Sequence, residues 1–575
     1  MNRTLKLTSA ATAAIPRVIM ITLTCIYAFS GLFGHDPWKN DDAQGFGSMW
    51  MVAHGNLHDI VFPHISGRDV LVGPPLPYWI GGLSIQILGS TIGAVNAARL
   101  VSGLCFIAAA LLIWYATYLL GRRSEVQPMA FAFGGQPSPT AFGRTIADGA
   151  LLIFIACIGL AIKVHEASPL LLELFGICLL IFGMTRSLGK SIQGGAMIGL
   201  ALGVIALSGS LTGALMLSVG SVMSLTLGQV KISRVGLCVL VLCFGLMLSI
   251  WPFTWYWTGA SSDHIHQAID VWLGPFALHK ISSLGVLFDL ATDFWTSTWP
   301  VWPLFSWSVY VCSKSDRTIW RSPHVFIPLC VCGSQFIPLL FSIDLNEHTL
   351  LLLTPPMSIL GAFGLPFLRR GLISFIDWLA MLSFTALAIF IWLIWFAKLT
   401  GYPAATADNI QRFIPGFIAH FDLLDLIFAL IITLIWIFIV RWRVSRAPRE
   451  IWRCLVISAS GTTLMWVLMM TLWLPTINYA KTYQIVAQHF AQALPKNARC
   501  IDSRFLGDAQ LASFVFFTQL PLQDDESCDY MLTHNQEEAK SSARLNHQRL
   551  KMIWEDRRDS DRDERLRLYQ ILENK

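Results

Sequence analysis

Apolar residues fill most of the chain between residues 15 and 474, in windows separated by short polar connections. A helix needs about twenty apolar residues to cross the hydrocarbon core of a bilayer, so these windows predict about thirteen membrane-spanning helices. Residues 77–90 are apolar too, but they are short and broken by glycine, and they are left out of the set. The predicted spans lie near residues 15–34, 98–121, 149–164, 169–185, 193–208, 210–228, 235–251, 296–313, 322–342, 349–368, 371–397, 422–440 and 451–474.

Basic residues gather on one side of this predicted bundle. Lysine and arginine precede the first span and follow every even-numbered span, as Arg122 and Arg123 follow the second. Because cytoplasmic connections of membrane proteins carry an excess of these cations, the N-terminus is predicted to be cytoplasmic. The odd-numbered connections and the tail after the last span are then external.

The N-terminal segment also fits a cleaved signal peptide, because a basic start precedes an apolar stretch from Val18 to Phe33. Its small residues, in the run TSAATAA, come before the apolar stretch, whereas a cleavage site follows one. We therefore expect a retained first span.

The composition divides the chain into two predicted domains. Residues 1–474 form the transmembrane domain, and residues 35–97 are its first external loop, with helices along the membrane surface and no full crossing. Residues 475–575 are polar and predict a small external α/β domain that begins with a helix, a strand and a second helix. We expect the final stretch, EDRRDSDRDERLRLYQILENK, to be a mixed-charge helix.

The overall composition supports a polytopic α-helical membrane protein. Hydrophobic residues make up 54% of the chain and charged residues 13%, too few for the surface of a soluble protein of this length. Most cysteines fall in or beside apolar segments and are expected to be small buried hydrophobes. Cys500 and Cys528 lie in the tail, on the side predicted to be oxidising, where we expect a disulfide between them.

Two adjacent carboxylates, Asp41 and Asp42, follow the first apolar window among Trp38, Phe46 and Trp50. These aromatic neighbours favour an amphipathic helix at the membrane surface. A partly desolvated carboxylate that faces a cavity suits general-base chemistry. Most surface aspartate pairs instead belong to solvated turns, and the spacing alone leaves both interpretations open.

The segment Gly73-Pro74-Pro75-Leu76-Pro77-Tyr78-Trp79 has a rigid pattern. Its prolines fix the backbone and end the preceding segment. Tyr78 and Trp79 suit the membrane interface, where amphipathic rings prefer to lie. By itself the segment predicts a rigid interfacial turn.

Together with Arg99-Leu100 and Gly121-Arg122-Arg123, these segments resemble the GT-C superfamily of polyprenyl-phosphate-dependent glycosyltransferases, in particular the aminoarabinose transferases and protein mannosyltransferases. In that branch an Asp-Glu pair opens the first external loop, and a Lys-Pro-Pro-Leu-x-Tyr-Trp segment follows. The resemblance implies a GT-C fold with Asp41 and Asp42 as catalytic residues. Its motifs are specific only in the first quarter of the chain. Nothing in the sequence requires a metal or another cofactor.

Two positions depart from the pattern of that branch. Gly73 stands where the resemblance implies a lysine that holds the lipid phosphate, and Asp42 stands in place of the glutamate. Other basic groups, such as Lys39, would then have to hold the phosphate. The candidates for the donor phosphate and lipid site are Arg68, Pro74, Pro75, Tyr78, Lys280 and His348.

Three ionisable residues lie where the third span ends and the fourth begins: His165, Glu166 and Glu173. Charges at membrane depth are costly and often functional. The resemblance implies a second acidic residue near the acceptor in this region, and a structural ion pair is the alternative. His264 and His266 alternate in an external loop, but two histidines without an acidic ligand are a poor metal site.

The sequence thus predicts an inverting glycosyltransferase of the bacterial inner membrane, with a periplasmic C-terminal domain. The resemblance implies a sugar donor linked to polyprenyl phosphate and a lipid, glycan or protein acceptor. A transporter or flippase is one alternative, although the ionisable residues cluster in external loops and at span ends. A non-catalytic assembly protein is another. The sequence shows neither a Gly-rich nucleotide loop nor a basic patch suited to nucleic acid.

Overall fold

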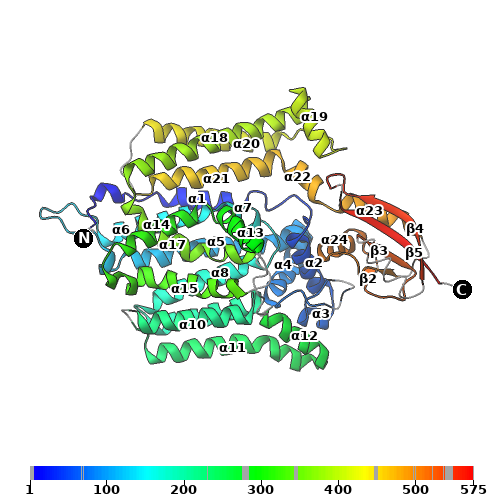
Figure 1. Cartoon of the computed structure of the whole chain (residues 1–575), viewed down its shortest axis with the longest axis horizontal. Coiled ribbons are helices and arrows are strands. Elements are labelled where there is room, and N and C mark those ends of the chain that lie inside the picture. The colour runs from blue at the N-terminus through cyan, green and yellow to red at the C-terminus, as the bar shows by residue number, and fades with distance from the viewer. Residues whose placement is uncertain are drawn as a thin grey trace.

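The apolar windows fold into a bundle of helices that lie along the long axis of the molecule (Figure 1). The structure is a computed structural model that describes all residues except 1–4, 66–67, 69, 229–230, 275–283, 342–346, 446–450, 496–497, 499, 521, 535–536, 538–547, 562 and 574–575. The N-terminus lies at one end of the bundle and the C-terminal domain at the other (Figure 1).

Long helices make up the body of the bundle. They are α1 (Arg17–Phe29), α5 (Ala94–Gly121), α6 (Pro139–Ile155), α8 (Leu170–Ser187), α9 (Ser191–Ser208), α10 (Leu211–Leu227), α11 (Arg234–Thr258), α14 (Val301–Ser313), α15 (Pro323–Phe341), α17 (Thr354–Gly364), α18 (Arg370–Thr400), α20 (Leu423–Ser445) and α21 (Arg453–Leu472). Further helices lie between them along the chain: α7 (Ile158–Lys163), α12 (Ser262–Leu273), α13 (Leu284–Ser297), α16 (Glu347–Leu351) and α19 (Ala404–Phe413). Four 3-10 turns cover Ser9–Thr12, Ser124–Val126, Arg317–Arg321 and Leu365–Phe367.

Within the described residues, nine helices are long and apolar enough to cross a membrane. They confirm a multi-pass membrane protein, while the predicted count of about thirteen spans stays a prediction. The window 149–164 is interrupted, because α6 ends at Ile155 and α7 begins at Ile158. The nine are Ser9–Phe29, Ala94–Gly121, Leu170–Ser187, Ser191–Ser208, Arg234–Thr258, His348–Phe367, Arg370–Thr400, Leu423–Val444 and Arg453–Leu472.

Helix α9 shows how small residues build the bundle. A Cβ at Gly195 would lie 2.1 Å from the carbonyl oxygen of Gly236, and one at Gly199 would lie 2.4 Å from that of Leu240. Both carbonyls belong to α11, so the glycines let two backbones approach closely, as small residues commonly do between membrane helices. The glycines that weaken the apolar signal of residues 193–208 therefore have a packing role.

Residues 35–97, predicted to be the first external loop, contain three helices, α2 (Asp41–His54), α3 (Leu57–Val61) and α4 (Leu76–Ile92). Prolines at the start of α4 fit the first helical turn, where no intrahelical donor is needed, and Gly93 ends the helix with φ +86°. Helix α4 packs against α2 and α5 and is not among the nine candidate spans. The absence of a full crossing in residues 35–97 stays a prediction.

The C-terminal residues form the predicted small domain, built on a five-stranded sheet (Figure 1). Its strand order is β2-β1-β3-β5-β4, with β1 parallel to β2 and β3, and β5 antiparallel to β3 and β4. The elements are α22 (Leu474–Lys481), α23 (Gln484–Ala493), β1 (Ile501–Asp502), α24 (Asp508–Thr518), β2 (Leu522–Gln523), β3 (Tyr530–Thr533), β4 (Gln548–Arg557) and β5 (Arg565–Glu573).

The prediction of a mixed-charge helix at the C-terminus is wrong, because this stretch contains the end of β4 and all of β5. The run Arg-Leu-Arg-Leu at residues 565–568 alternates charged and apolar side chains, which is the period of a strand. Leu566 and Leu568 are fully buried in the core of the domain. The many charged residues in this stretch favoured the prediction of a solvated helix over that of a strand.

Candidate active site

Asp42 is a buried structural anchor at the start of α2. Its carboxylate accepts hydrogen bonds from Arg99 of α5, at 2.5 Å from Nη2 and 3.2 Å from Nε, and both side chains are fully buried. It also accepts bonds from the backbone N–H groups of Trp38, at 2.8 Å, and Ala167, at 2.7 Å. Burial by itself would raise the pKa of Asp42, but Arg99 outweighs this effect and lowers the pKa below its ordinary value.

Asp41, one residue earlier, has a different environment. Its side chain is half exposed, and Lys163 Nζ donates to its Oδ2 at 2.6 Å. The same ammonium group donates to Oε2 of Glu166 at 3.0 Å. Glu166 is 6% exposed, and burial raises its pKa to about 7 although Lys163 opposes the shift. Lys163 therefore links the exposed carboxylate to a buried one that titrates near neutral pH.

A second lysine lies close to these acids. Lys481, at the end of α22, places its Nζ 4.6 Å from the centre of the Trp38 ring. Burial lowers its pKa, while the negative charges of Glu166 and Asp42 oppose the shift. In the described part of the chain its ammonium group makes no hydrogen bond or ion pair. Lys481 thus offers an uncommitted cation beside the acidic group.

The position of α2 depends on two close approaches. A Cβ at Gly45 would lie 1.9 Å from the carbonyl oxygen of Ala167, and one at Gly47 would lie 2.5 Å from Cβ of Ala512 in α24. Only glycine permits these distances. Helix α2 is therefore held between the α7–α8 connection and the C-terminal domain, with Asp41 at its first residue.

The predicted donor segment borders a separate cavity of about 500 Å³. Gly73 and Pro74 line it from one side, and Gly209, Ser210 and Asp270 line it from others. Pro75 does not line this cavity. A Cβ at Gly73 would lie 3.3 Å from the hydroxyl oxygen of buried Tyr78. Burial raises the pKa of that phenol well above its usual range.

Glu173 lies beside this cavity and contacts His348. His348 Nε2 lies 3.1 Å from Oε2 of Glu173, in the first turn of α8. A Cβ at Gly209, which lines the cavity, would lie 2.4 Å from Oε1 of Glu173. The structure thus brings together three segments that the sequence singled out separately.

The remaining predicted residues have other surroundings. His165 is buried, with Nδ1 at 2.6 Å from the carbonyl oxygen of Ala161 and Nε2 at 3.1 Å from the indole nitrogen of Trp466. Both ring nitrogens are therefore engaged. Lys280 lies outside the described residues.

Arg68 faces the C-terminal domain. Its guanidinium donates to Asp508, to Asp524 at 2.9 Å, and to the backbone carbonyls of Ser503 and Leu506 at 3.3 and 3.1 Å. These contacts hold the segment between α3 and α4 against the C-terminal domain. They leave the guanidinium little capacity for a lipid phosphate.

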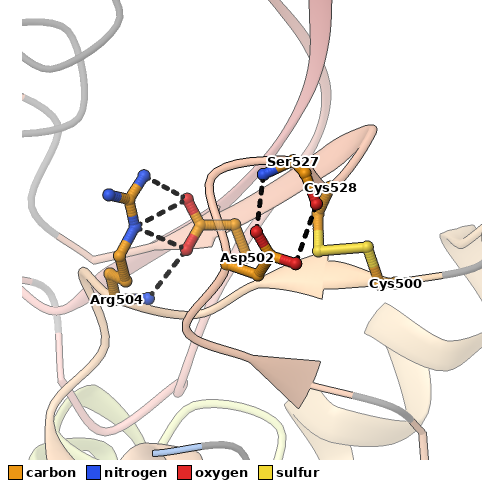
Figure 2. The surroundings of a disulfide bond; sticks show 6 residues. Cys500, Asp502, Arg504, Ser527 and Cys528 are labelled. Carbon is orange, nitrogen blue, oxygen red and sulfur yellow. Dashed lines mark hydrogen bonds and ion pairs between the residues drawn. A yellow bond between two sulfur atoms is a disulfide. The ribbon is translucent and has the colours of Figure 1, made fainter.

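The expected disulfide is present in the C-terminal domain, where it joins Cys500 and Cys528 (Figure 2). The two Cα atoms are 5.3 Å apart, because Cys500 precedes β1, Cys528 comes shortly before β3, and these strands are neighbours. Asp502 and Arg504 form an ion pair next to the bridge, at 2.9 Å (Figure 2).

Lys163 and Lys481 are absent from the residues predicted from the sequence. A lysine inside the apolar window 149–164 was a signal for Lys163, since a charge in such a window often has a function. Lys481 has no comparable signal, because only the fold brings the start of the tail next to the first loop.

This geometry and fold define a multi-pass membrane protein with an acidic site at the start of α2. Two solved structures share the fold: ArnT from Cupriavidus metallidurans in the apo state, with a TM-score of 0.61, and the same protein bound to undecaprenyl phosphate, with a TM-score of 0.57. Each is 13% identical in sequence, over 96% of this chain and 97% of the other. No family model and no curated protein matches the sequence. The likeness confirms the fold that the motifs imply.

Proposed function

We propose that the protein is an inverting glycosyltransferase of the bacterial inner membrane. It transfers a sugar from a polyprenyl-phosphate donor to a lipid, glycan or protein acceptor on the periplasmic side. The main support for this proposal is that Asp41 and Asp42 have different environments in a protein with an ArnT-like fold. Asp42 is buried and fully bonded, whereas Asp41 is half exposed and held by a lysine. ArnT binds undecaprenyl phosphate in one of the two structures, which supports the donor class.

Asp41 is the proposed proton acceptor. The acceptor oxygen attacks the anomeric carbon of the sugar from the face opposite the lipid phosphate, and the bond between that carbon and the phosphate oxygen breaks. The proton of the acceptor moves to the Asp41 carboxylate, and the bonding electron pair leaves with the polyprenyl phosphate. Lys163 orients the carboxylate through its 2.6 Å bond. The rigid anchor of Asp42 fixes the helix that carries it.

Lys481 is the proposed substitute for the lysine that is absent at residue 73. Developing negative charge on the departing phosphate needs a cation that is not already neutralised. Arg68 is bonded to carboxylates of the C-terminal domain, and His348 contacts Glu173. Lys481 has no such partner in the described structure and lies near Asp42 and Glu166. A polyprenyl phosphate that reaches the membrane boundary beside Trp38 would meet this ammonium group.

The test uses a strain that lacks the gene, complemented with variants, and mass spectrometry of its lipids and surface glycans. Asp41→Asn keeps the size of the side chain but removes its basicity, so we expect transfer to fall about 10²- to 10⁴-fold. The control is Asp556→Asn, because Asp556 lies on β4 and, among the described residues, its carboxylate bonds only to His489 and the adjacent backbone.

Lys481→Met should raise the donor concentration needed for half-maximal transfer, in membranes supplied with isolated donor lipid. The proposal fails if Asp41→Asn restores the modification as fully as the wild type does. It also fails if the gene deletion changes no glycosylated lipid, glycan or protein. If the protein were a transporter or an assembly protein, Asp41→Asn would restore the modification fully.

A further inference from the structure

A second cavity lies at the opposite end of the bundle, the end that carries the N-terminus in Figure 1. It has a volume of about 370 Å³ and lies among the ends of α14 and α17, the start of α15, and residues 125–129 after α5. Arg99 lies near the start of α5 and Gly121 ends it, so roughly 33 Å separates Arg99 and the acidic pair from the end of the helix that leads to this cavity. The cavity is therefore distinct from the candidate active site.

Polar groups on one side of this cavity lack partners. His324 lines it and is 7% exposed, and its ring makes no hydrogen bond to any other described residue. Its ring packs against that of Phe363, at 5.0 Å between centres. Next to it, Arg123 has a buried Nε with no hydrogen-bond partner in the described part of the chain. Arg123 does not itself line the cavity, but it pairs with Glu125, which does. A buried polar ring without a partner is costly, so His324 points to a ligand that accepts hydrogen bonds.

The same side of the cavity also carries an acid. Glu125 lines it, and its Oε1 accepts a hydrogen bond from Arg123 Nη2 at 2.9 Å. A carboxylate has more acceptor capacity than this single bond uses. The site thus offers donors for an anion and, next to them, an acceptor for a cation.

The rest of the lining is apolar. Val311, Leu360 and Phe363 form part of it, and Phe142 of α6 completes that wall. An amphipathic cavity at the end of a membrane bundle suits a ligand with a charged headgroup and a hydrocarbon body. Basic residues follow the spans at this end, among them Arg122 and Lys314, and such residues attract the phosphate groups of membrane lipids.

We propose that this cavity binds the headgroup of a phospholipid that carries a primary amine, as phosphatidylethanolamine does. The phosphate accepts a hydrogen bond from the ring of His324 and lies near the positive charge of Arg123, which pairs with Glu125 in the lining. The ammonium group donates to Glu125, and the first carbons of the acyl chains lie against Leu360 and Phe363. The site does not depend on the proposed glycosyl transfer.

The test is native mass spectrometry of the whole detergent-solubilised protein with an equimolar mixture of phosphatidylethanolamine and phosphatidylglycerol of identical acyl chains. We expect the wild type to retain the amine lipid in preference. Glu125→Gln removes the charge that holds the ammonium group, so the preference should fall at least about tenfold. His324→Phe fills the space of the ring without its nitrogens and should weaken retention of both lipids. Glu526→Gln, the same change in the C-terminal domain, is the matched control.

A further arm adds soluble phosphoethanolamine, which has the headgroup but no acyl chain. Displacement of the bound lipid would support recognition of the headgroup. Equal retention of the two lipids by the wild type would overturn the assignment of an amine lipid. Unchanged preference in Glu125→Gln would do the same, and this conservative variant keeps the test decisive if His324→Phe fails to fold.

Discussion

Replacing Asp42 by asparagine tests whether this carboxylate has a structural role. The amide is nearly the same size and still accepts a hydrogen bond, but it no longer neutralises Arg99, whose guanidinium is fully buried. Removing one partner of a buried ion pair costs about 3–5 kcal/mol, because the other charge stays in a low-dielectric environment. Arg99 keeps two backbone acceptors, the carbonyls of His35 and Asp36 at 2.8 and 2.6 Å. We therefore expect a loss near the lower end of this range, about 3 kcal/mol in the free energy of unfolding.

The measurement is equilibrium unfolding in mixed micelles with a rising fraction of dodecyl sulfate, followed by tryptophan fluorescence. Asp41→Asn serves as the neighbouring control, and it should cost less than about 1 kcal/mol because the Asp41 carboxylate is half exposed. The double variant Asp42→Asn with Arg99→Met should regain part of the loss, since it removes the uncompensated charge. If Asp42→Asn is as stable as the wild type, Arg99 does not depend on this carboxylate. The separation of roles between Asp41 and Asp42 would then be wrong.

Three further predictions concern the surroundings of the site. Burial raises the pKa of Glu166 from 4.5 to about 7, so the folded protein binds a proton that the unfolded chain releases. Stability should fall by about 3 kcal/mol as the pH rises between these values, and Glu166→Gln should flatten that part of the pH profile of unfolding. Gly45→Ala should disrupt folding because of the 1.9 Å contact with Ala167, whereas Gly245→Ala, with no atom within 4 Å, should be neutral in the same thermal melts. Reducing the bridge between Cys500 and Cys528 should destabilise the C-terminal domain by about 3 kcal/mol, seen as faster limited proteolysis, and unchanged cleavage would refute this estimate.

The sequence by itself determined the helical membrane architecture, the small C-terminal domain and the place of the acidic pair. Each of these depends on local composition. A run of apolar residues must cross or enter the bilayer wherever it occurs, and a helix satisfies its own backbone hydrogen bonds. The pairing of Cys500 with Cys528 could also be predicted from the sequence, because only these two cysteines lie outside the apolar segments. The hairpin at the C-terminus was missed although its alternation of Arg and Leu was visible, because charge density favoured a solvated helix.

Only the tertiary structure decided which carboxylate is buried. Asp41 and Asp42 look equivalent in the sequence, and their difference comes from Arg99, 57 residues further along the chain. Arg68 was a plausible ligand for phosphate until the fold placed it against Asp508, 440 residues away. Lys481 likewise became a candidate only when the tail folded back beside Trp38. Charge neutralisation depends on which groups meet across the folded molecule, and the local pattern that specifies a span does not contain that information.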